Sequence, residues 1–321
     1  MYFSKESEKN IEMFLPHFGE FINDKLVYKM ISTDAIIKKL YINIKNAIEK
    51  EKDGIRNDTF LKTKSDIFVS ALFQSRYVST KIHKFIDSKF TIQMSGPAPL
   101  PIKYHYKTKI GAREIDIVFI LFKEEKNIDT WFNLVVSWLM VLDKYSPHKC
   151  IKRLKIHFLM TPLKKELPEL QSATLSADNC NSAVTTSCPS DGEILIYRQE
   201  EWFKVFIHET FHAYGLDFID PQLCSKIKKI FPINSNCNIN DSYAEFWATI
   251  IHNIYISYML LTDKNNIDTL CLYVDFCIKM EQIFSLFQCM KVLSFMGLDY
   301  ESLYNNDDIS SIIDLQYKEE N

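Results

Sequence analysis

Residues 200–215 read EEWFKVFIHETFHAYG, and this stretch decides the fold of the second half of the chain. Its apolar residues recur at helical spacing, and its first residues are acidic, which suits the positive end of a helix dipole. Gly215 stands where a helix C-cap requires a left-handed residue. The stretch therefore predicts a helix over 200–214 that is apolar enough to pack between a sheet and other helices.

The same stretch contains the pattern HExxH, formed by His208, Glu209 and His212. Two histidines four residues apart lie on one face of a helix, so both imidazoles can bind one ion. Zn²⁺ suits them, because it accepts neutral imidazole nitrogen and keeps an open position in catalytic sites. Composition alone predicts about 0.01 such patterns in this chain, so we interpret it as a zinc site with Glu209 as catalytic base. The alternative is a pair of core histidines held by hydrogen bonds.

A third zinc ligand has to come from outside the helix. Residues 240–248 read NDSYAEFWA and place Glu245 on a second predicted helix, 33 residues after His212. Glu245 is the expected third ligand, and Asp217 and Asp220 are the alternatives that lie nearer to the motif.

Two residues beside Glu245 suggest other roles for this segment. Ser242 and Glu245 also fit a capping box, in which the glutamate bonds to the start of its own helix. Asp241, one turn earlier, is a candidate hydrogen-bond acceptor for a zinc-binding histidine, or simply an N-cap. Both alternatives stay open on the sequence.

Residues 181–247 resemble the zincin metallopeptidases of gluzincin type, in which a glutamate on a later helix completes an HExxH site. The run YAEF at 243–246 is similar to the glutamate helix of that group. The related metzincin pattern fits less well, because Phe218 stands where its third ligand would be. The block 196–218 also looks like uncharacterised metallopeptidase-like proteins of large nucleocytoplasmic DNA viruses.

The resemblance implies zinc-dependent hydrolysis of a protein or peptide substrate. Zincins often take an oxyanion donor from outside the motif, for which Tyr243 and His252 are candidates, although either can be a core residue instead. Their substrate lies along an edge strand, for which 181–186 is the candidate. Two rival interpretations are a catalytically inactive structural or virion protein with a metallopeptidase-like fold, and a zinc hydrolase of non-peptide amides.

The whole chain predicts an α+β protein. A helical N-terminal region over 1–95, with helical spacing from 11 to 90, precedes a proline-rich boundary and a zincin-like domain over 96–321. That domain is expected to combine a small twisted sheet, the active-site helix and a helical C-terminal half. Its other expected elements are a hairpin around 110–112, strands at 154–161 and 193–197, and helices at 129–145, 242–261 and 267–296.

Composition narrows the function classes. The 38 basic and 41 acidic residues leave a net charge of −3, which argues against a nucleic-acid partner, and only 7 glycines argue against a glycine-rich phosphate loop. The start of the chain has no signal-peptide pattern, and no apolar stretch reaches membrane-span length, so we expect an intracellular, cytoplasmic protein without a membrane partner. The eight cysteines are interpreted as reduced thiols, although Cys180 and Cys188 could pair if oxidised. The oligomeric state is left open.

Overall fold

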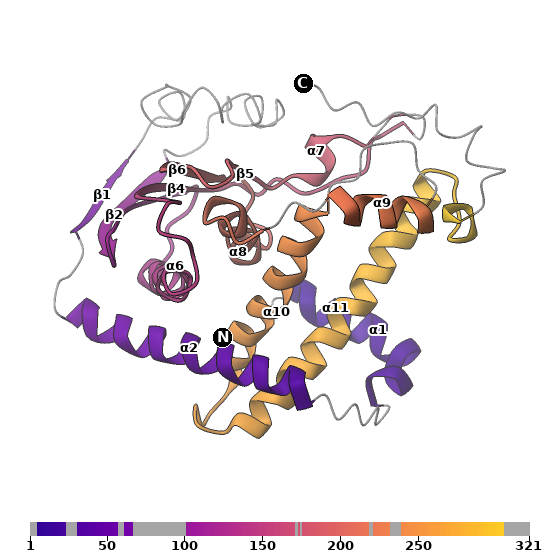
Figure 1. Cartoon of the computed structure of the whole chain (residues 1–321), viewed down its shortest axis with the longest axis horizontal. Helices are drawn as coiled ribbons and strands as arrows, with labels where there is room; N and C mark the ends of the chain where they lie inside the picture. The colour runs from indigo at the N-terminus through magenta and orange to yellow at the C-terminus, as the bar shows by residue number, and fades with distance from the viewer. Residues whose placement is uncertain are drawn as a thin grey trace.

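The computed structural model describes residues 5–23, 31–56, 61–66, 101–170, 173, 175–217, 221–231 and 239–304. These residues form a mixed α+β structure with one six-stranded sheet (Figure 1). The strands are β1 (Leu61–Asp66), β2 (Ile102–Ile110), β3 (Arg113–Leu121), β4 (Arg153–Met160), β5 (Ala183–Thr185) and β6 (Asp191–Ile196). The helices are α1 (Lys5–Asn23), α2 (Ile31–Arg56), α6 (Ile128–Asp143), α7 (Ala177–Cys180), α8 (Trp202–Ala213), α9 (Pro221–Ile230), α10 (Asn240–Leu260) and α11 (Ile267–Phe295), followed by a 3-10 turn at Glu301–Leu303.

The sheet is mixed and has the strand order β1-β2-β3-β4-β6-β5. β3, β4 and β6 run parallel in its centre, whereas β1, β2 and β5 pair antiparallel with their neighbours. The predicted hairpin around 110–112 is confirmed as β2–β3, and the predicted strand at 181–186 is confirmed as β5 at the edge of the described sheet.

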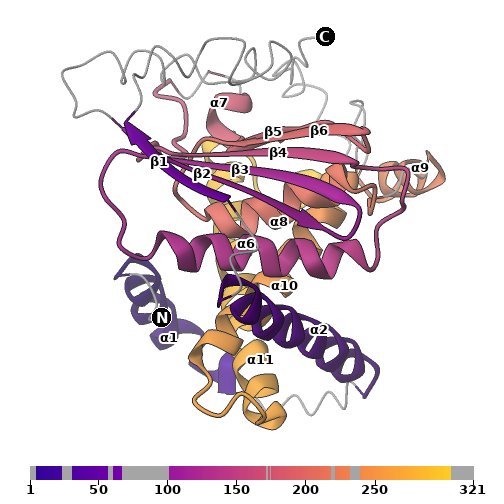
Figure 2. The same cartoon turned by 90° about the vertical axis from the view of Figure 1, so that its left-hand side faces the viewer.

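Helices α2, α6, α8, α10 and α11 lie in layers beneath one face of the sheet (Figure 2). α6 and α8 run directly under the strands, and α2, α10 and α11 lie farther from the sheet (Figure 2). Aromatic side chains fill the space between the sheet and α8: Phe158 on β4 packs on Phe119 of β3 at 4.6 Å between ring centroids, and on Trp202 and Phe206 of α8 at 5.3 and 5.4 Å. Burying several such rings fixes how α8 lies on the sheet.

The sequence predicted a helical N-terminal region, but the described part of this region also contains a strand. Residues 61–66 form β1, which pairs along its whole length with β2. The helical pattern was misleading here because a neighbouring strand supplies the pairing that the local sequence cannot reveal. Helices α1 and α2 are confirmed, and Tyr41 and Ile44 of α2 belong to the same buried core as the sheet. The predicted boundary near 95 lies outside the described residues.

The prediction that all eight cysteines are reduced thiols is wrong for two of them, because Cys150 and Cys188 form a disulfide. The two residues are 38 positions apart in the chain, and only the fold brings their Cα atoms to 4.7 Å. Among the other cysteines that the structure describes, Cys180, Cys277 and Cys289 are free thiols. None of the described helices combines the length and the apolar character that crossing a membrane requires.

Candidate metal centre

One face of α8 packs against α6, and the opposite face carries His208 and His212. Thr210, fully buried, accepts a hydrogen bond from the Trp138 indole of α6 at 2.9 Å and donates to the Ile207 carbonyl at 2.6 Å. Thr210 lies between His208 and His212 in sequence and points away from them, because neighbouring positions differ by about 100° around a helix. The histidines therefore face away from α6 and toward α10.

The end of α8 is built around Gly215. This glycine has φ +64°, its N–H donates to the His212 carbonyl at 3.1 Å, and the N–H of Leu216 donates to the Phe211 carbonyl at 2.8 Å. This left-handed turn is the C-cap that the sequence predicted. The N–H of Cys188 also donates to the His212 carbonyl, at 3.0 Å, so the disulfide lies against the last turn of the helix.

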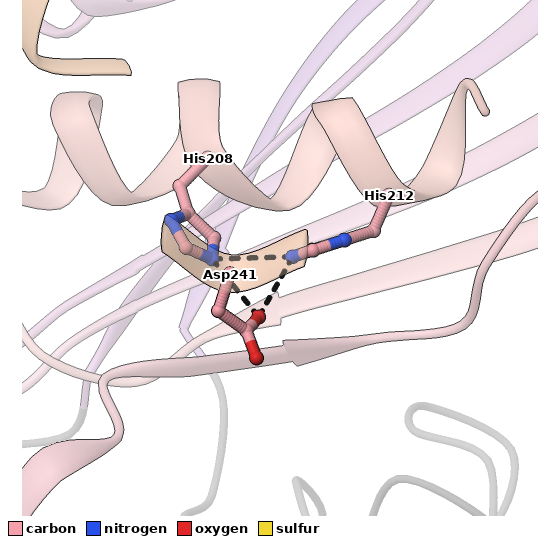
Figure 3. Close-up of side chains that lie close together, drawn as sticks. All are labelled: His208, His212 and Asp241. Atoms are coloured by element: carbon pink, nitrogen blue, oxygen red, sulfur yellow. Dashed lines mark hydrogen bonds and ion pairs between the residues drawn. The ribbon is translucent and has the colours of Figure 1, made fainter. Parts of the chain in front are cut away.

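Three donor atoms converge in front of this helix. Nε2 of His212 lies 3.2 Å from Nε2 of His208 and 3.1 Å from Oδ1 of Asp241, and Nε2 of His208 lies 3.7 Å from the same carboxylate oxygen. Figure 3 shows both imidazoles reaching from α8 toward Asp241, which belongs to the first turn of α10. The three atoms form the one group among the described residues that is compact enough to hold a metal ion.

The spacing of these atoms fits zinc. Ligands at about 2.0–2.1 Å from a tetrahedral ion are separated from one another by about 3.3 Å. The three measured separations, 3.1, 3.2 and 3.7 Å, are close to that value. Two imidazoles and one carboxylate form a known catalytic zinc ligand set, and the Asp241 side chain, which is 65% exposed, leaves room for a water. The residues therefore fit a zinc ion with an open position.

The Nδ1 atom of each histidine, on the ring side away from the converging Nε2 atoms, is hydrogen-bonded to a carboxylate. Nδ1 of His208 lies 3.1 Å from Glu245 Oε2, and Nδ1 of His212 lies 2.8 Å from Asp217 Oδ2. A carboxylate can only accept, so both Nδ1 atoms carry the hydrogen and both Nε2 atoms are left for a metal. Carboxylate partners of this kind orient metal-binding histidines and raise their basicity.

Asp241 and Glu245 thus occupy each other's predicted positions. The sequence placed Glu245 at the metal and Asp241 behind a histidine, whereas the structure places Asp241 in the donor group and Glu245 on His208 Nδ1. The capping box is wrong, because α10 begins at Asn240 and Ser242 is already inside its first turn. Asp241 and Glu245 are one helical turn apart, so both contact α8. Asp241 lies beside the two Nε2 atoms, and Glu245 lies beside His208 Nδ1 and Lys204.

Electrostatic coupling in the site is strong. Burial lowers the pKa of His208, but Asp241, Glu245 and Glu209 outweigh burial and raise it to about 9. Burial raises the pKa of the Glu209 carboxyl, and this is opposed by His208 and His212. The pKa of Asp241 is far below its usual range, because the two histidines stabilise its charge. The metal-free site therefore holds protons that a metal would displace.

The other predicted site residues lie elsewhere. Tyr243 packs its ring on Phe211 at 6.3 Å, on a different side of α10 from Asp241. His252 is eleven residues beyond Asp241, about 16 Å along the helix, and its ring packs beside Phe203. Neither belongs to the donor group. Asp220 and Phe218 lie outside the described residues.

Sequence reasoning missed two contributors to the site. It considered Asp217 only as an alternative metal ligand, whereas the structure places it on Nδ1 of His212. It gave no role to Lys204, whose ammonium lies 2.9 Å from Glu245 Oε1. A lysine one turn before a predicted metal ligand, on the same helical face, was the available signal.

Comparisons of the chain with family models, with curated proteins and with solved structures found no match. The chemistry of the site is therefore argued from its own residues.

Proposed function

We propose that this protein is a zinc-dependent hydrolase of peptide bonds, with zinc held by His208, His212 and Asp241 and with Glu209 as general base. The observation that carries the proposal is the convergence of two Nε2 atoms and one carboxylate oxygen, while both Nδ1 atoms bond to other carboxylates. A pair of histidines kept only for packing has no need of four surrounding carboxyl groups. A zincin-like fold of gluzincin type, as expected from the sequence, belongs to this proposal.

Zinc bound there would lower the pKa of a water toward about 7 and polarise a substrate carbonyl. Glu209 lies between the two histidines in sequence and interacts electrostatically with both and with Asp241. In the proposed reaction its carboxylate takes the proton of the attacking water and then gives it to the leaving amine. Its raised pKa favours the first transfer, because burial makes this carboxylate a stronger base for the proton of the water.

A protein or peptide substrate would lie along β5. Among the described residues this strand is at the sheet edge, pairs with β6 alone, and packs against α8. An extended peptide can add to such an edge by main-chain hydrogen bonds. Buried Arg198 shapes the segment that leads into β5, since its guanidinium donates to the carbonyls of Asn181 at 3.0 Å and Asp178 at 2.7 Å.

The test is cleavage of a peptide library by the purified full chain, with Glu209→Gln beside it. We expect Glu209→Gln to lose cleavage by at least 10²-fold while binding as much zinc as the parent. Glu200→Gln makes the same change at an exposed glutamate before the same helix and should cleave like the parent. Full activity in Glu209→Gln would refute the role of this base.

The same assay separates the rival functions. A hydrolase of non-peptide amides would cleave acyl-amide substrates and leave peptides intact. A structural or virion protein with this fold would cleave neither, even when it is loaded with zinc.

An intracellular place of action, in a cytoplasm or, following the viral resemblance, in a virion, belongs to the same proposal and rests on expectations from the sequence. Reduced cysteines were one of its reasons, and the Cys150–Cys188 disulfide removes that reason for two of the eight. Thiol titration of the protein from its native source tests the point.

A further inference from the structure

A buried lysine lies directly behind the metal centre. Lys204, on α8 one turn before His208, is only 9% exposed. Its ammonium lies 2.9 Å from Glu245 Oε1 and 3.6 Å from Glu201 Oε1, and Glu281 of α11 and His252 of α10 also interact with this cluster. Burying a lysine is costly unless it is paired, so its position here needs a reason.

Lys204 and His208 hold the two oxygens of the same carboxylate. Glu245 accepts from Lys204 through Oε1 and from His208 Nδ1 through Oε2. The glutamate is half-exposed and could otherwise turn toward solvent or toward the metal position, which Asp241 one turn away already occupies. With both oxygens engaged, Glu245 has a single orientation, and so does the imidazole that it contacts.

We propose that Lys204 is a positioning residue of the metal centre: it holds Glu245 on Nδ1 of His208, which aims Nε2 of His208 at the metal and leaves the third ligand position to Asp241. This inference rests on the proposed metal site and adds a residue that acts through Glu245 without touching the metal. It also explains why Glu245, at the spacing expected of a ligand, lies on the other side of the histidine.

The experiment is a double-mutant cycle on metal affinity. Co²⁺ is titrated into the metal-free full chain and followed by visible absorption for the parent, Lys204→Met, Glu245→Gln and the double variant. Lys204→Met keeps an apolar side chain of similar length and removes the charge. We expect each single variant to bind Co²⁺ 10- to 100-fold more weakly, as is typical when a partner of a metal ligand is lost.

The cycle distinguishes positioning from general packing. If Lys204 acts through Glu245, Lys204→Met in the Glu245→Gln background should cost less than about threefold, because the interaction is already broken. Equal losses in both backgrounds would overturn the proposal, as would an unchanged affinity of Lys204→Met. Lys279→Met is the matched control, since Lys279 is similarly buried in an ion pair with Asp275 on α11; it should bind Co²⁺ like the parent.

Folding and the proposed function are checked separately. Far-UV circular dichroism and thermal unfolding of the metal-free variants show whether Lys204→Met folds; if it does not, Lys204→Leu, a shorter apolar side chain that also removes the donor to Glu245, replaces it in the cycle. Failure of the parent to bind Co²⁺ would overturn the metal site and this inference together. A parent that binds Co²⁺ while Lys204→Met binds equally well would overturn the inference alone.

Discussion

Glu245 accepts a hydrogen bond from Nδ1 of His208 at 3.1 Å, and so lies on the side of the imidazole opposite to the converging Nε2 atoms. This relationship makes the glutamate an orienting group and leaves Asp241 as the third donor of the cluster. The two carboxylates are one turn apart on the same helix, but substituting them should have different consequences.

The first prediction separates these two carboxylates. Asp241→Asn should remove bound zinc from the purified protein, because a neutral amide replaces a charged ligand. Glu245→Gln should retain zinc at saturating metal and bind it 10- to 100-fold more weakly. Metal content by elemental analysis and Zn²⁺ competition titration measure both effects.

A carboxylate far from the site serves as the control for this comparison. Asp275 on α11 has an exposed fraction of 64%, against 65% for Asp241, so Asp275→Asn removes an equally exposed charge. It should leave zinc content unchanged. Zinc lost from Glu245→Gln and kept in Asp241→Asn would restore the ligand set that the sequence predicted.

The second prediction concerns pH. Metal binding needs neutral histidines, and the pKa of His208 in the metal-free site is raised to about 9, with that of His212 also raised. Protons therefore compete with the metal below about pH 9, and zinc affinity should rise from pH 6 to pH 9 with release of protons. Isothermal titration in two buffers of different ionisation enthalpy counts the protons released.

The stability of the metal-free protein should change in the opposite direction. Since the folded-state pKa of His208 is above the unfolded value of about 6.5, its contribution is fully present below pH 6.5 and is lost as pH rises toward 9. Urea unfolding of the metal-free chain should show this decrease, and His208→Gln should abolish the part that His208 contributes. A metal-free stability that rises through this pH interval would contradict the assignment.

The third prediction tests the turn that ends α8. A Cβ on Gly215 would lie 2.9 Å from Cys150 Sγ, in addition to the strain of its φ of +64°. Gly297, which ends α11 in the same way with φ +71°, has no atom of the described residues within 4 Å of the corresponding position. Gly297→Ala should cost about 1–2 kcal/mol of unfolding free energy, from backbone strain alone. Gly215→Ala should cost more, because the disulfide has to move as well.

Zinc affinity provides a second measurement for the same pair of variants. The turn at Gly215 leads the chain back to Asp217, which contacts His212. Gly215→Ala should therefore weaken zinc binding, whereas Gly297→Ala should not. Equal unfolding free energies for the two variants would show that the contact with Cys150 is relieved without cost.

The fourth prediction concerns the disulfide. Closing a loop of 38 residues restricts the unfolded chain, which is worth about 4 kcal/mol in the chain-entropy description. Cys150→Ser with Cys188→Ser should lower the unfolding free energy by that order. Thiol titration of the unfolded parent should find two more thiols after reduction than before, and an equal number would show that the bond does not form in the isolated protein.

The sequence by itself determined several helices, the β2–β3 hairpin and the shared face of the two histidines on α8. Local periodicity and the capping glycine were sufficient to predict α8, α10, α11 and the β2–β3 hairpin, because these depend on neighbours in the chain. The HExxH spacing was likewise sufficient to predict that His208 and His212 share a helical face, since four residues make about one turn. β1 was missed because its pairing partner is about forty residues away.

Only the tertiary structure decided which groups meet in front of α8. Asp241 and Glu245 both lie on the face of α10 that reaches α8, and sequence spacing cannot tell which of them lies level with the Nε2 atoms. That depends on how α10 crosses α8, which is set by packing among residues distant in the chain. The Cys150–Cys188 disulfide and the contact of Lys204 with Glu245 likewise join residues that are distant in the chain. The spacing of residues along a helix determines which of them share a face. How two helices pack determines which of those residues meet across the interface.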